Sequence, residues 1–558
     1  MSSDRTRWFH ALLFLVALLT PACSRGPERP FEIVCILPFE DLSPAGHGAI
    51  GRGLATLTAE RTTGDRKVRV AQVANLRDAQ LLGSTRVLSG WYEVRDGQVV
   101  LHANLRDEAA GKALKTIDLT AAEADFPKLA VSLAAETGAP VHNYALPKAE
   151  AVIALERGLS EDALRIDPGF GAAHLARVER LLRAGDGAGL AQAVEAARSA
   201  RLTEADRARL DMMSARLKNS MPEQLAALKR LTATQTANID LLRALLDLQF
   251  QQRDYKPALE TASQILELSP ADEDTLNKQG YIYTFSGDLP GARRAFEDYR
   301  KKRPESVNAV DSMAEALFYF RRYDEAAGLF LEAHKKNPTI LNGAEPFRAA
   351  LSYALAGNLK EADAEMARLF EARKADPATP WRQAVWNRMT GRKSNMPPTA
   401  AGLAADALYA VRDGDRARGA ALAAEARKLV KSPPEATLAA MATLLSQPSA
   451  PPAVWESRIA AAASNPAQAR LRAELLGWAL LLDHHYNEAA AIWRPAVDQT
   501  SPFNNNEARL PLFWALAEGG NKDEAKKAMP EGWLPPSGLD PGFGMLFYPR
   551  VPELRTKL

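Results

Sequence analysis

The sequence predicts an α+β multidomain protein, with a small mixed α/β N-terminal domain followed by an all-α helical solenoid. The first observation is a series of short apolar or alternating segments between residues 31 and 119, which are typical of strands. The second is proline at a fixed interval of 34 residues, at Pro270, Pro304 and Pro338. A repeat of that length indicates stacked helix–turn–helix units, each buried only against its neighbours.

The N-terminus has the features of a targeting segment. Arg5 and Arg7 precede an apolar run over residues 11–19. That run is shorter than the roughly 20 apolar residues that cross a bilayer, but it fits the core of a secretory signal peptide. We therefore expect a signal peptide over residues 1–22 and a short tether over residues 23–30.

Cys23 directly follows the small residue Ala22. This pair resembles the lipobox of bacterial lipoproteins, although Thr20 and Pro21 depart from its usual pattern. The resemblance implies lipid attachment at Cys23 and a place in the bacterial cell envelope, lipid-anchored and facing the periplasm. An ordinary cleaved signal and an uncleaved anchor stay open as alternatives. The other cysteine, Cys35, lies in an apolar run, so we expect a buried, inert thiol there.

Residues 31–140 are predicted to form the mixed α/β domain. Asp96-Gly97 joins two alternating segments and indicates a tight hairpin, because both turn positions need positive φ. Strands are expected at residues 31–38, 67–71, 86–94, 98–106 and 112–119. Helices are expected at residues 48–60, 75–82 and 124–136.

Three segments of this domain carry a family resemblance. They are ILPFEDLSP at residues 36–44, Gly53-Leu54 in the first helix, and the hairpin sequence at residues 87–114. Together they resemble the N-terminal domain of the periplasmic TolB protein and related domains that stand beside helical repeats in bacterial regulators. The resemblance implies a domain for protein contacts or sensing, with no catalytic residues.

One unit of the repeat shows the expected helical hairpin. Apolar and small residues recur every three or four positions over residues 275–286, and the turn Gly287-Asp288 follows. A second amphipathic segment ends at Pro304, which lacks the N–H needed to continue a helix.

Small residues in this unit indicate where its two helices meet. We expect Gly280 and Ala292 to lie at the closest crossing, with Tyr283 and Phe296 filling the wedge beside them. With Pro304, these residues resemble the tetratricopeptide repeat at five positions. That family has a fold of paired helices that bind other proteins.

The resemblance predicts an array over residues 145–529 that is clearest at 239–376 and degraded between 172 and 232. Residues 530–558 are expected to form a C-terminal tail. A weaker unit near the C-terminus is marked by Gly477, Ala489 and Trp493.

In tetratricopeptide arrays the first helix of each unit lines the concave face, so this resemblance implies a partner-binding groove. Its candidate residues mix charged, amide and aromatic groups, which suits an extended peptide or a protein segment. They are Arg243, Asp247, Phe250, Asn277, Lys278, Tyr281, Phe285, Asp311, Ser312, Glu315, Tyr319 and Arg348. Each of them would also be compatible with merely covering a helix surface.

Composition and motifs argue against several functions. The formal net charge is +2, whereas general nucleic-acid binders carry a strongly basic face. The sequence lacks the motifs of P-loop proteins, serine hydrolases, zinc proteases and kinases, so we expect no enzyme activity, no cofactor, no metal and no nucleic acid. His484-His485 is the one adjacent histidine pair, and a solvated turn explains it better than a metal site.

Gly46 to Gly51 match the pattern G-x-G-x-x-G between a predicted strand and a predicted helix. A dinucleotide site would also need a doubly wound parallel sheet and an acidic residue after the second strand, and neither is predicted. We therefore expect these glycines to serve loop entry and close helix–strand packing.

The leading hypothesis is a non-enzymatic, membrane-tethered scaffold or adaptor of the bacterial cell envelope, which binds a protein or peptide through its repeat array. Two alternatives are kept. One is an accessory regulator of cell-wall synthesis, and the other is a nucleotide-binding sensor or enzyme that uses the Gly46–Gly51 loop.

Overall fold

The computed structural model describes residues 31–44, 47–62, 64, 67–392, 394–465, 468–499, 506–528 and 554. The predicted signal peptide, Cys23 with its tether, and all of the predicted C-terminal tail except Leu554 lie outside the described residues. The chain forms two compact units, Met1–Leu248 and Gln249–Leu558. Among the described residues, no helix is both long enough and apolar enough to cross a bilayer.

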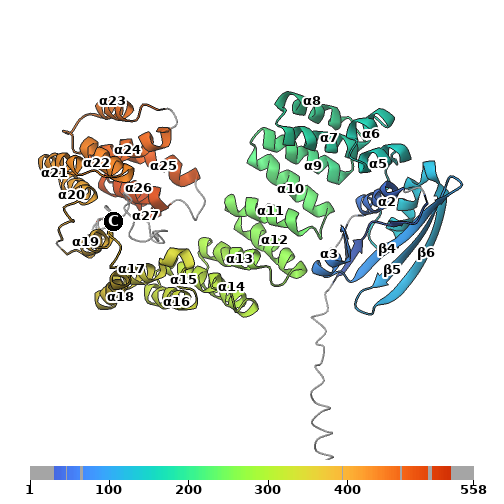
Figure 1. The fold of residues 1–558 in the computed structure, drawn as a ribbon, viewed down its shortest axis with the longest axis horizontal. Coiled ribbons are helices and arrows are strands. Elements are labelled where there is room, and N and C mark those ends of the chain that lie inside the picture. The colour runs from blue at the N-terminus through green and yellow to red at the C-terminus, as the bar shows by residue number, and fades with distance from the viewer. Residues whose placement is uncertain are drawn as a thin grey trace, which may run out of the picture. The chain divides into compact units, whose positions relative to one another are not determined.

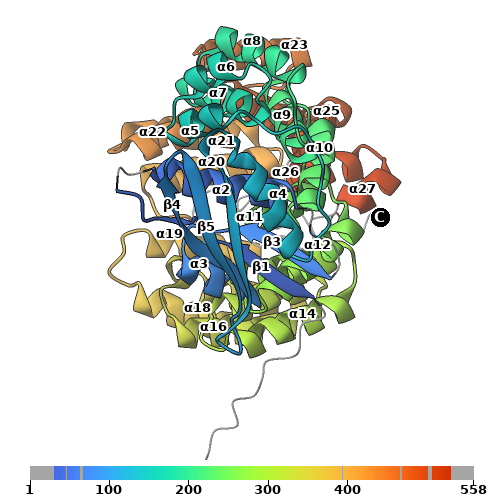
Figure 2. The ribbon, with the colours of Figure 1, turned by 90° about the vertical axis from the view of Figure 1, so that its right-hand side faces the viewer.

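The first unit begins with one mixed sheet of strand order β3-β1-β4-β5-β6, and β2 pairs with β4 (Figure 2). The strand β1 is parallel to β3 and β4, whereas β4, β5 and β6 form an antiparallel meander. The strands are β1 (Glu32–Ile36), β2 (Glu40–Asp41), β3 (Val68–Gln72), β4 (Arg86–Arg95), β5 (Gln98–Asp107) and β6 (Lys112–Ala122). The helices among and after them are α2 (Gly48–Glu60), α3 (Leu76–Leu81) and α4 (Pro127–Glu136).

Most of these elements lie where the sequence predicts them, including the hairpin turn at Asp96-Gly97, where both residues have positive φ. Two differ. The strand β2 was not predicted, because two residues are too short for an alternating pattern. The closing helix α4 begins at Pro127 rather than at residue 124, after a single 3-10 turn, because proline is favoured in the first turn of a helix.

The core of this sheet continues without a break into the first helices of the array. Val99, Leu101 and Ala103 of β5 are fully buried on the face that α2 covers. A Cβ added at Gly53 of α2 would lie 2.7 Å from Val152 of α5, so the two helices touch there. The same hydrophobic cluster extends further along the array. The α/β domain and the first helices therefore share one core.

Cys35 is fully buried in β1, as the apolar run around it predicts. Burial, with a smaller effect from Glu108, raises the pKa of its thiol to about 12. A thiol that stays protonated is a poor nucleophile, so the burial of Cys35 is consistent with the expected inert thiol.

The array continues through helix pairs, which confirms the predicted fold class (Figure 1). In the first unit these helices are α5 (Ala149–Glu156), α6 (Ser160–Ile166), α7 (Gly171–Ala184), α8 (Gly187–Arg198), α9 (Glu204–Leu217), α10 (Met221–Thr234) and most of α11 (Ile239–Gln251). The second unit continues with α12 (Tyr255–Leu268), α13 (Glu273–Phe285), α14 (Leu289–Lys302), α15 (Asn308–Tyr319), α16 (Tyr323–Lys336), α17 (Glu345–Ala356), α18 (Leu359–Ala372) and α19 (Thr379–Met389).

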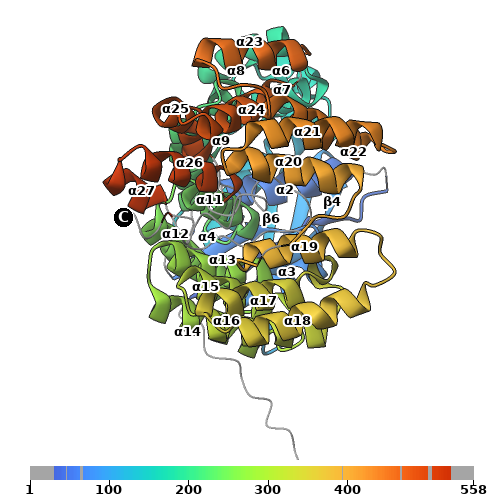
Figure 3. The same cartoon turned by 90° about the vertical axis from the view of Figure 1, so that its left-hand side faces the viewer.

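The remaining helices of the second unit follow the same up-and-down pattern, and Figure 3 shows α20, α21 and α22 side by side. They are α20 (Ala400–Arg412), α21 (Arg416–Lys428), α22 (Pro433–Leu445), α23 (Pro452–Ala462), α24 (Ala469–Leu482), α25 (Tyr486–Gln499), α26 (Asn506–Glu518) and α27 (Lys522–Ala528).

A left-handed residue marks the turn inside each regular helix pair. It recurs every 34 residues, at Gly185, Asn219, Arg253, Gly287 and Arg321, with φ between 51° and 83°. The repeat therefore keeps its period through residues 172–232, where the sequence motif is degraded. Only two of these five turn residues are glycine, so the other turns lack the residue type that normally signals them.

Close packing at glycine holds the two helices of a pair together. A Cβ at Gly280 of α13 would clash with the ring of Phe296 of α14, and Ala292 of α14 is also buried. Gly477 of α24 stands in the same relation to Trp493 of α25, at 2.6 Å. In both pairs the glycine precedes the aromatic residue by 16 positions. This geometry confirms the predicted close crossing at Gly280.

Gly280→Ala should lower the free energy of unfolding by about 1–3 kcal/mol, because the added methyl group must displace the fully buried Phe296 ring. Gly328→Ala on α16 is the matched control, since a Cβ there meets nothing within 4 Å. It should stabilise by about 0.5–1 kcal/mol through helix propensity alone. Urea unfolding measures both, and equal effects of the two substitutions would contradict the packing described here.

Candidate functional site

The first helices α13, α15 and α17 of three successive pairs lie along one side of their part of the second unit (Figure 1), with α14, α16 and α18 on the other. The helix α13 contacts α15 as well as its own partner α14. Side chains that project from the first helices therefore meet those of the next pair.

Five of the predicted groove residues come together on this face, and Glu345 joins them. Tyr281 donates a hydrogen bond from its hydroxyl to Glu315 Oε2 at 2.5 Å. The guanidinium of Arg348 reaches Glu315 Oε1 at 3.0 Å, Asp311 Oδ1 at 3.3 Å and Glu345 Oε1 at 3.9 Å. We call this group the acidic cluster and define it as Tyr281, Asp311, Ser312, Glu315, Glu345 and Arg348.

The acidic cluster is buried and its charges do not balance. The side chains of Arg348 and Asp311 are 5% and 6% exposed, that of Glu345 is 0% exposed, and only that of Glu315 reaches 25%. Three carboxyl groups thus surround one guanidinium. Burying an unpaired charge is costly, so the cheapest response is for a carboxyl group to keep its proton.

The pKa values follow from that imbalance. Burial, and then the charge of Glu315, raise the pKa of Asp311 to about 7. Burial also raises the pKa of Glu345. Burial opposes the charge of Arg348, but its three acidic neighbours keep the pKa of the guanidinium above its ordinary value. Burial and Glu315 raise the pKa of Tyr281 well above its ordinary value.

Several polar atoms of this region also have no hydrogen-bond partner among the described residues. They are both carboxylate oxygens of Glu345, Nε of Arg348 and, next to the cluster on α13, Oδ1 of Asn277. Three of these four atoms are acceptors. Buried polar groups in native proteins are normally satisfied, so these four atoms are exceptions that need an explanation.

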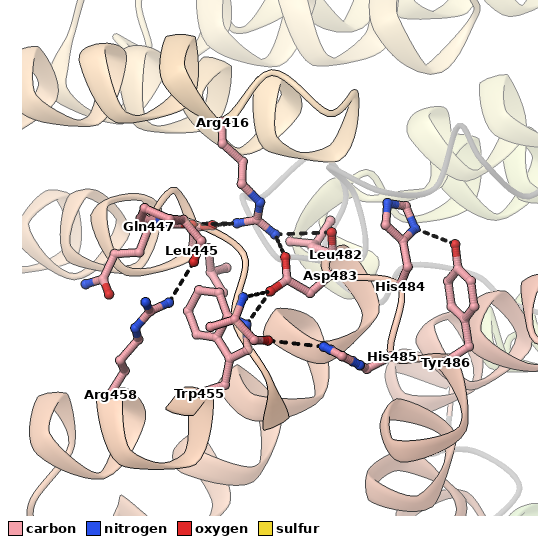
Figure 4. A network of polar contacts seen from close by, with 12 residues as sticks. Arg416, Leu445, Gln447, Trp455, Arg458, Leu482, Asp483, His484, His485 and Tyr486 are labelled. Atoms are coloured by element: carbon pink, nitrogen blue, oxygen red, sulfur yellow. Dashed lines mark hydrogen bonds and ion pairs between the residues drawn. The ribbon is translucent and has the colours of Figure 1, made fainter. Parts of the chain in front are cut away.

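A second, largely buried charged pair in the same unit, Arg416 with Asp483, provides the contrast (Figure 4). Arg416 at the start of α21 donates to the carbonyl oxygen of Leu445 at 2.6 Å and to the carboxylate of Asp483. Asp483 also accepts from the N–H of Ala450 at 2.8 Å and from the indole of Trp455. Although burial opposes it, these donors and Arg416 hold the pKa of Asp483 below its ordinary value. Here one guanidinium pairs with one carboxylate, and both make further hydrogen bonds to the protein. Such a satisfied pair is typical of a structural interaction that connects helix ends.

Aromatic rings border the acidic cluster. The rings of Tyr281 and Phe285 are stacked with their centroids 6.0 Å apart, and Tyr319 stands edge-on to Phe285 at 5.5 Å. Tyr319 is 38% exposed, and it lies four residues after Glu315 on α15. Residues with that spacing are neighbours on one helix face, so an exposed ring and the most exposed carboxylate stand side by side.

The other predicted groove residues do not belong to the acidic cluster. Asn277 and Lys278 lie half-buried on α13. Arg243 and Asp247 lie on the part of α11 that belongs to the first unit, where Arg243 pairs with Asp240 at 3.2 Å.

Sequence reasoning missed Glu345. The usable signal was its spacing of three residues before Arg348, which places both side chains on one helix face.

The two motifs set aside in the sequence are engaged in local contacts. His484 is exposed at a left-handed turn and bonds to the Tyr486 hydroxyl at 2.6 Å, while His485 bonds to the carbonyl of Ala450 at 3.1 Å (Figure 4). In the part of the chain that the structure describes, no group of three or more histidine, cysteine, aspartate or glutamate side chains is arranged to hold a metal ion.

The glycine-containing segment at the start of α2 also makes contacts within the protein. Gly46 lies outside the described residues, but the N–H of His47 donates to the carboxylate of Asp41. A Cβ at Gly51 would lie 3.0 Å from the carbonyl carbon of Phe39. This glycine serves close packing between the helix and the segment after β1, as the sequence predicts.

No protein-family model matches the chain. A tetratricopeptide repeat protein from Parabacteroides merdae is 17% identical with a TM-score of 0.30, over 48% of this chain and 97% of that one. MamA from Desulfovibrio magneticus is 14% identical with a TM-score of 0.26, over 31% and 97% of the two chains. The Naa15/Naa10 structure bound to HypK is 14% identical with a TM-score of 0.33, over 71% and 63%.

These similarities concern the fold alone. The helical array is of the tetratricopeptide type because of its own packing, in which Gly280 lets the ring of Phe296 approach the backbone of the paired helix.

The acidic cluster predicts a pH dependence of stability. Between the ordinary aspartate pKa of about 4 and about 7, the folded protein holds more protons at Asp311 than the unfolded chain does. The stability from this proton is complete below about pH 4 and is lost as the pH rises through about 7. Asp311→Asn cannot ionise, so its melting temperature should fall less than that of the wild type between about pH 5 and pH 8.

Thermal unfolding followed by circular dichroism at several pH values measures this difference. Glu297→Gln, at an exposed position on α14, removes the same charge outside the cluster and should leave the wild-type profile unchanged. Parallel profiles for Asp311→Asn and the wild type would contradict the assignment.

Proposed function

We propose that this protein is a non-enzymatic scaffold that binds a segment of a partner protein on the face formed by α13, α15 and α17. Stacked helix pairs generally present extended surfaces of this kind to other proteins. The observation that carries the proposal is the combination of the acidic cluster with the partly exposed rings of Phe285 and Tyr319.

The chemistry of this face suits protein recognition. Aromatic side chains contribute much of the energy at protein interfaces, and buried polar groups around them give specificity. This face has partly exposed aromatic rings next to buried charged groups. By contrast, Arg416 and Asp483 form their hydrogen bonds with other groups of the protein.

We further propose that the scaffold is tethered to a membrane of the bacterial cell envelope and faces the periplasm. The support is the sequence Thr20-Pro21-Ala22-Cys23 after a short apolar run. The resemblance of residues 31–140 to the TolB N-terminal domain stays a prediction and is consistent with that location.

Photo-crosslinking tests the face directly. A benzoylphenylalanine in place of Tyr319 should give discrete adducts with a partner protein in cells of the native host, because this ring is 38% exposed at the edge of the acidic cluster. The same residue in place of Gly328, an exposed position on the second helix α16 with open space around it, is the control. Adducts of equal yield at both positions, or none at Tyr319, would count against the proposed face.

Lipid attachment has its own test. Metabolic labelling with a palmitate analogue should mark the wild type and be lost in Cys23→Ala, because the acyl groups attach at that residue in lipoproteins. The matched control is Cys35→Ala, whose thiol is buried in β1. Label that persists in Cys23→Ala would contradict the tether.

A further inference from the structure

In the acidic cluster, carboxyl groups outnumber basic groups. When all its groups are ionised, three carboxylates face one guanidinium, which leaves a formal charge of −2. The atoms without a hydrogen-bond partner are both oxygens of the fully buried Glu345 and Nε of Arg348 within the cluster, and Oδ1 of Asn277 next to it. A ligand that balances the charge of the cluster must therefore bring positive charge.

Access to the region is through Glu315. Its side chain is 25% exposed, whereas the side chains of Asp311, Glu345 and Arg348 are almost fully buried. Tyr319, one turn further along α15, is 38% exposed, and Phe285 packs edge-on against it. The accessible surface here thus combines a partly exposed carboxylate with a neighbouring exposed aromatic ring.

We propose that the partner segment places a lysine side chain on this surface, with its ammonium on Glu315 and its methylene groups along Tyr319. An ammonium is compact and carries three donors, and a carboxylate such as that of Glu315 can accept more than the one bond that each of its oxygens has here. Aromatic faces attract cations, and the methylene stem of lysine packs well on apolar surface. The broad, planar position of a guanidinium between the acids is already taken by Arg348. This inference rests on the proposed function, since it names the group that the face recognises.

The proposal carries a proton-linkage signature. Asp311 is faced by Glu315 on its own helix, by Glu345 and Arg348 from α17, and by Tyr281 from α13. An arriving cation favours the ionised form of Asp311, so binding near neutral pH releases a proton. With a pKa of about 7 for Asp311, the affinity should rise by up to about ten-fold from pH 6 to pH 8.

The test uses fluorescently labelled glycine–serine peptides that differ only at a central lysine, acetyl-lysine or arginine, titrated with the full chain and followed by anisotropy. We expect the lysine peptide to bind and the acetyl-lysine peptide not to. Glu315→Gln should weaken the lysine peptide about ten-fold or more, because a hydrogen bond to a charged group is lost. Glu297→Gln on the exposed side of α14 should leave its affinity unchanged.

Two further variants test the roles of Asp311 and Tyr319 separately. Asp311→Asn should flatten the rise in affinity with pH, and Tyr319→Ala, an exposed substitution that does not disturb the core, should weaken binding. Equal affinity for lysine and acetyl-lysine, full affinity in Glu315→Gln, or no binding at all overturns the proposal. An arginine peptide that binds as tightly as the lysine peptide overturns the choice of lysine. If crosslinks form at Tyr319 while the lysine peptide does not bind, the proposed function stands and this inference fails.

Discussion

The missing side chain at Gly280 lets the ring of Phe296 lie directly against the backbone of α13, and the rest of this face depends on that approach. This close contact sets the distance between α13 and α14. It thereby also sets the contact of α13 with α15, the first helix of the following pair. Only with the first helices this close does the Tyr281 hydroxyl reach Glu315 on the neighbouring pair. Helix packing of this kind leaves little freedom, so the backbone itself positions the polar groups of the acidic cluster before any partner arrives.

Two arginines in the second unit, Arg348 and Arg416, differ in how completely their charge is matched by neighbouring groups. Arg416 meets a single carboxylate, and that carboxylate is further satisfied by a backbone N–H and an indole. Arg348 stands among three carboxyl groups, one of which has no hydrogen-bond partner for either oxygen. Buried ion pairs give little net stability even when they are complete. A buried ion cluster with unmatched carboxyl groups is therefore hard to explain by stability alone. For this reason we propose that the cluster around Arg348 serves partner binding.

The sequence was sufficient for the strands, the hairpin and the close crossing at Gly280, because each depends on local patterns. The sequence was insufficient where a left-handed turn is formed by a residue other than glycine. Asn219 adopts the left-handed turn that glycine normally marks, so the regular period before residue 239 was hidden. Glu345 was missed because the connection before α17 is irregular, with Leu341, Asn342 and Gly343 all at positive φ. Side-chain burial and charge balance depend on neighbours distant in the chain, which no local pattern shows.

The hydrophobic core shared by the sheet and the first array helices also has a thermodynamic meaning. Val34, Leu101, Val152 and Phe170 belong to one continuous cluster, so a cut near residue 140 would expose apolar surface on both sides. Segments that share a core melt together as one cooperative element. The sheet then acts as the end cap that a stack of helix pairs requires for solubility, rather than as a module that evolution or a protein engineer is free to exchange.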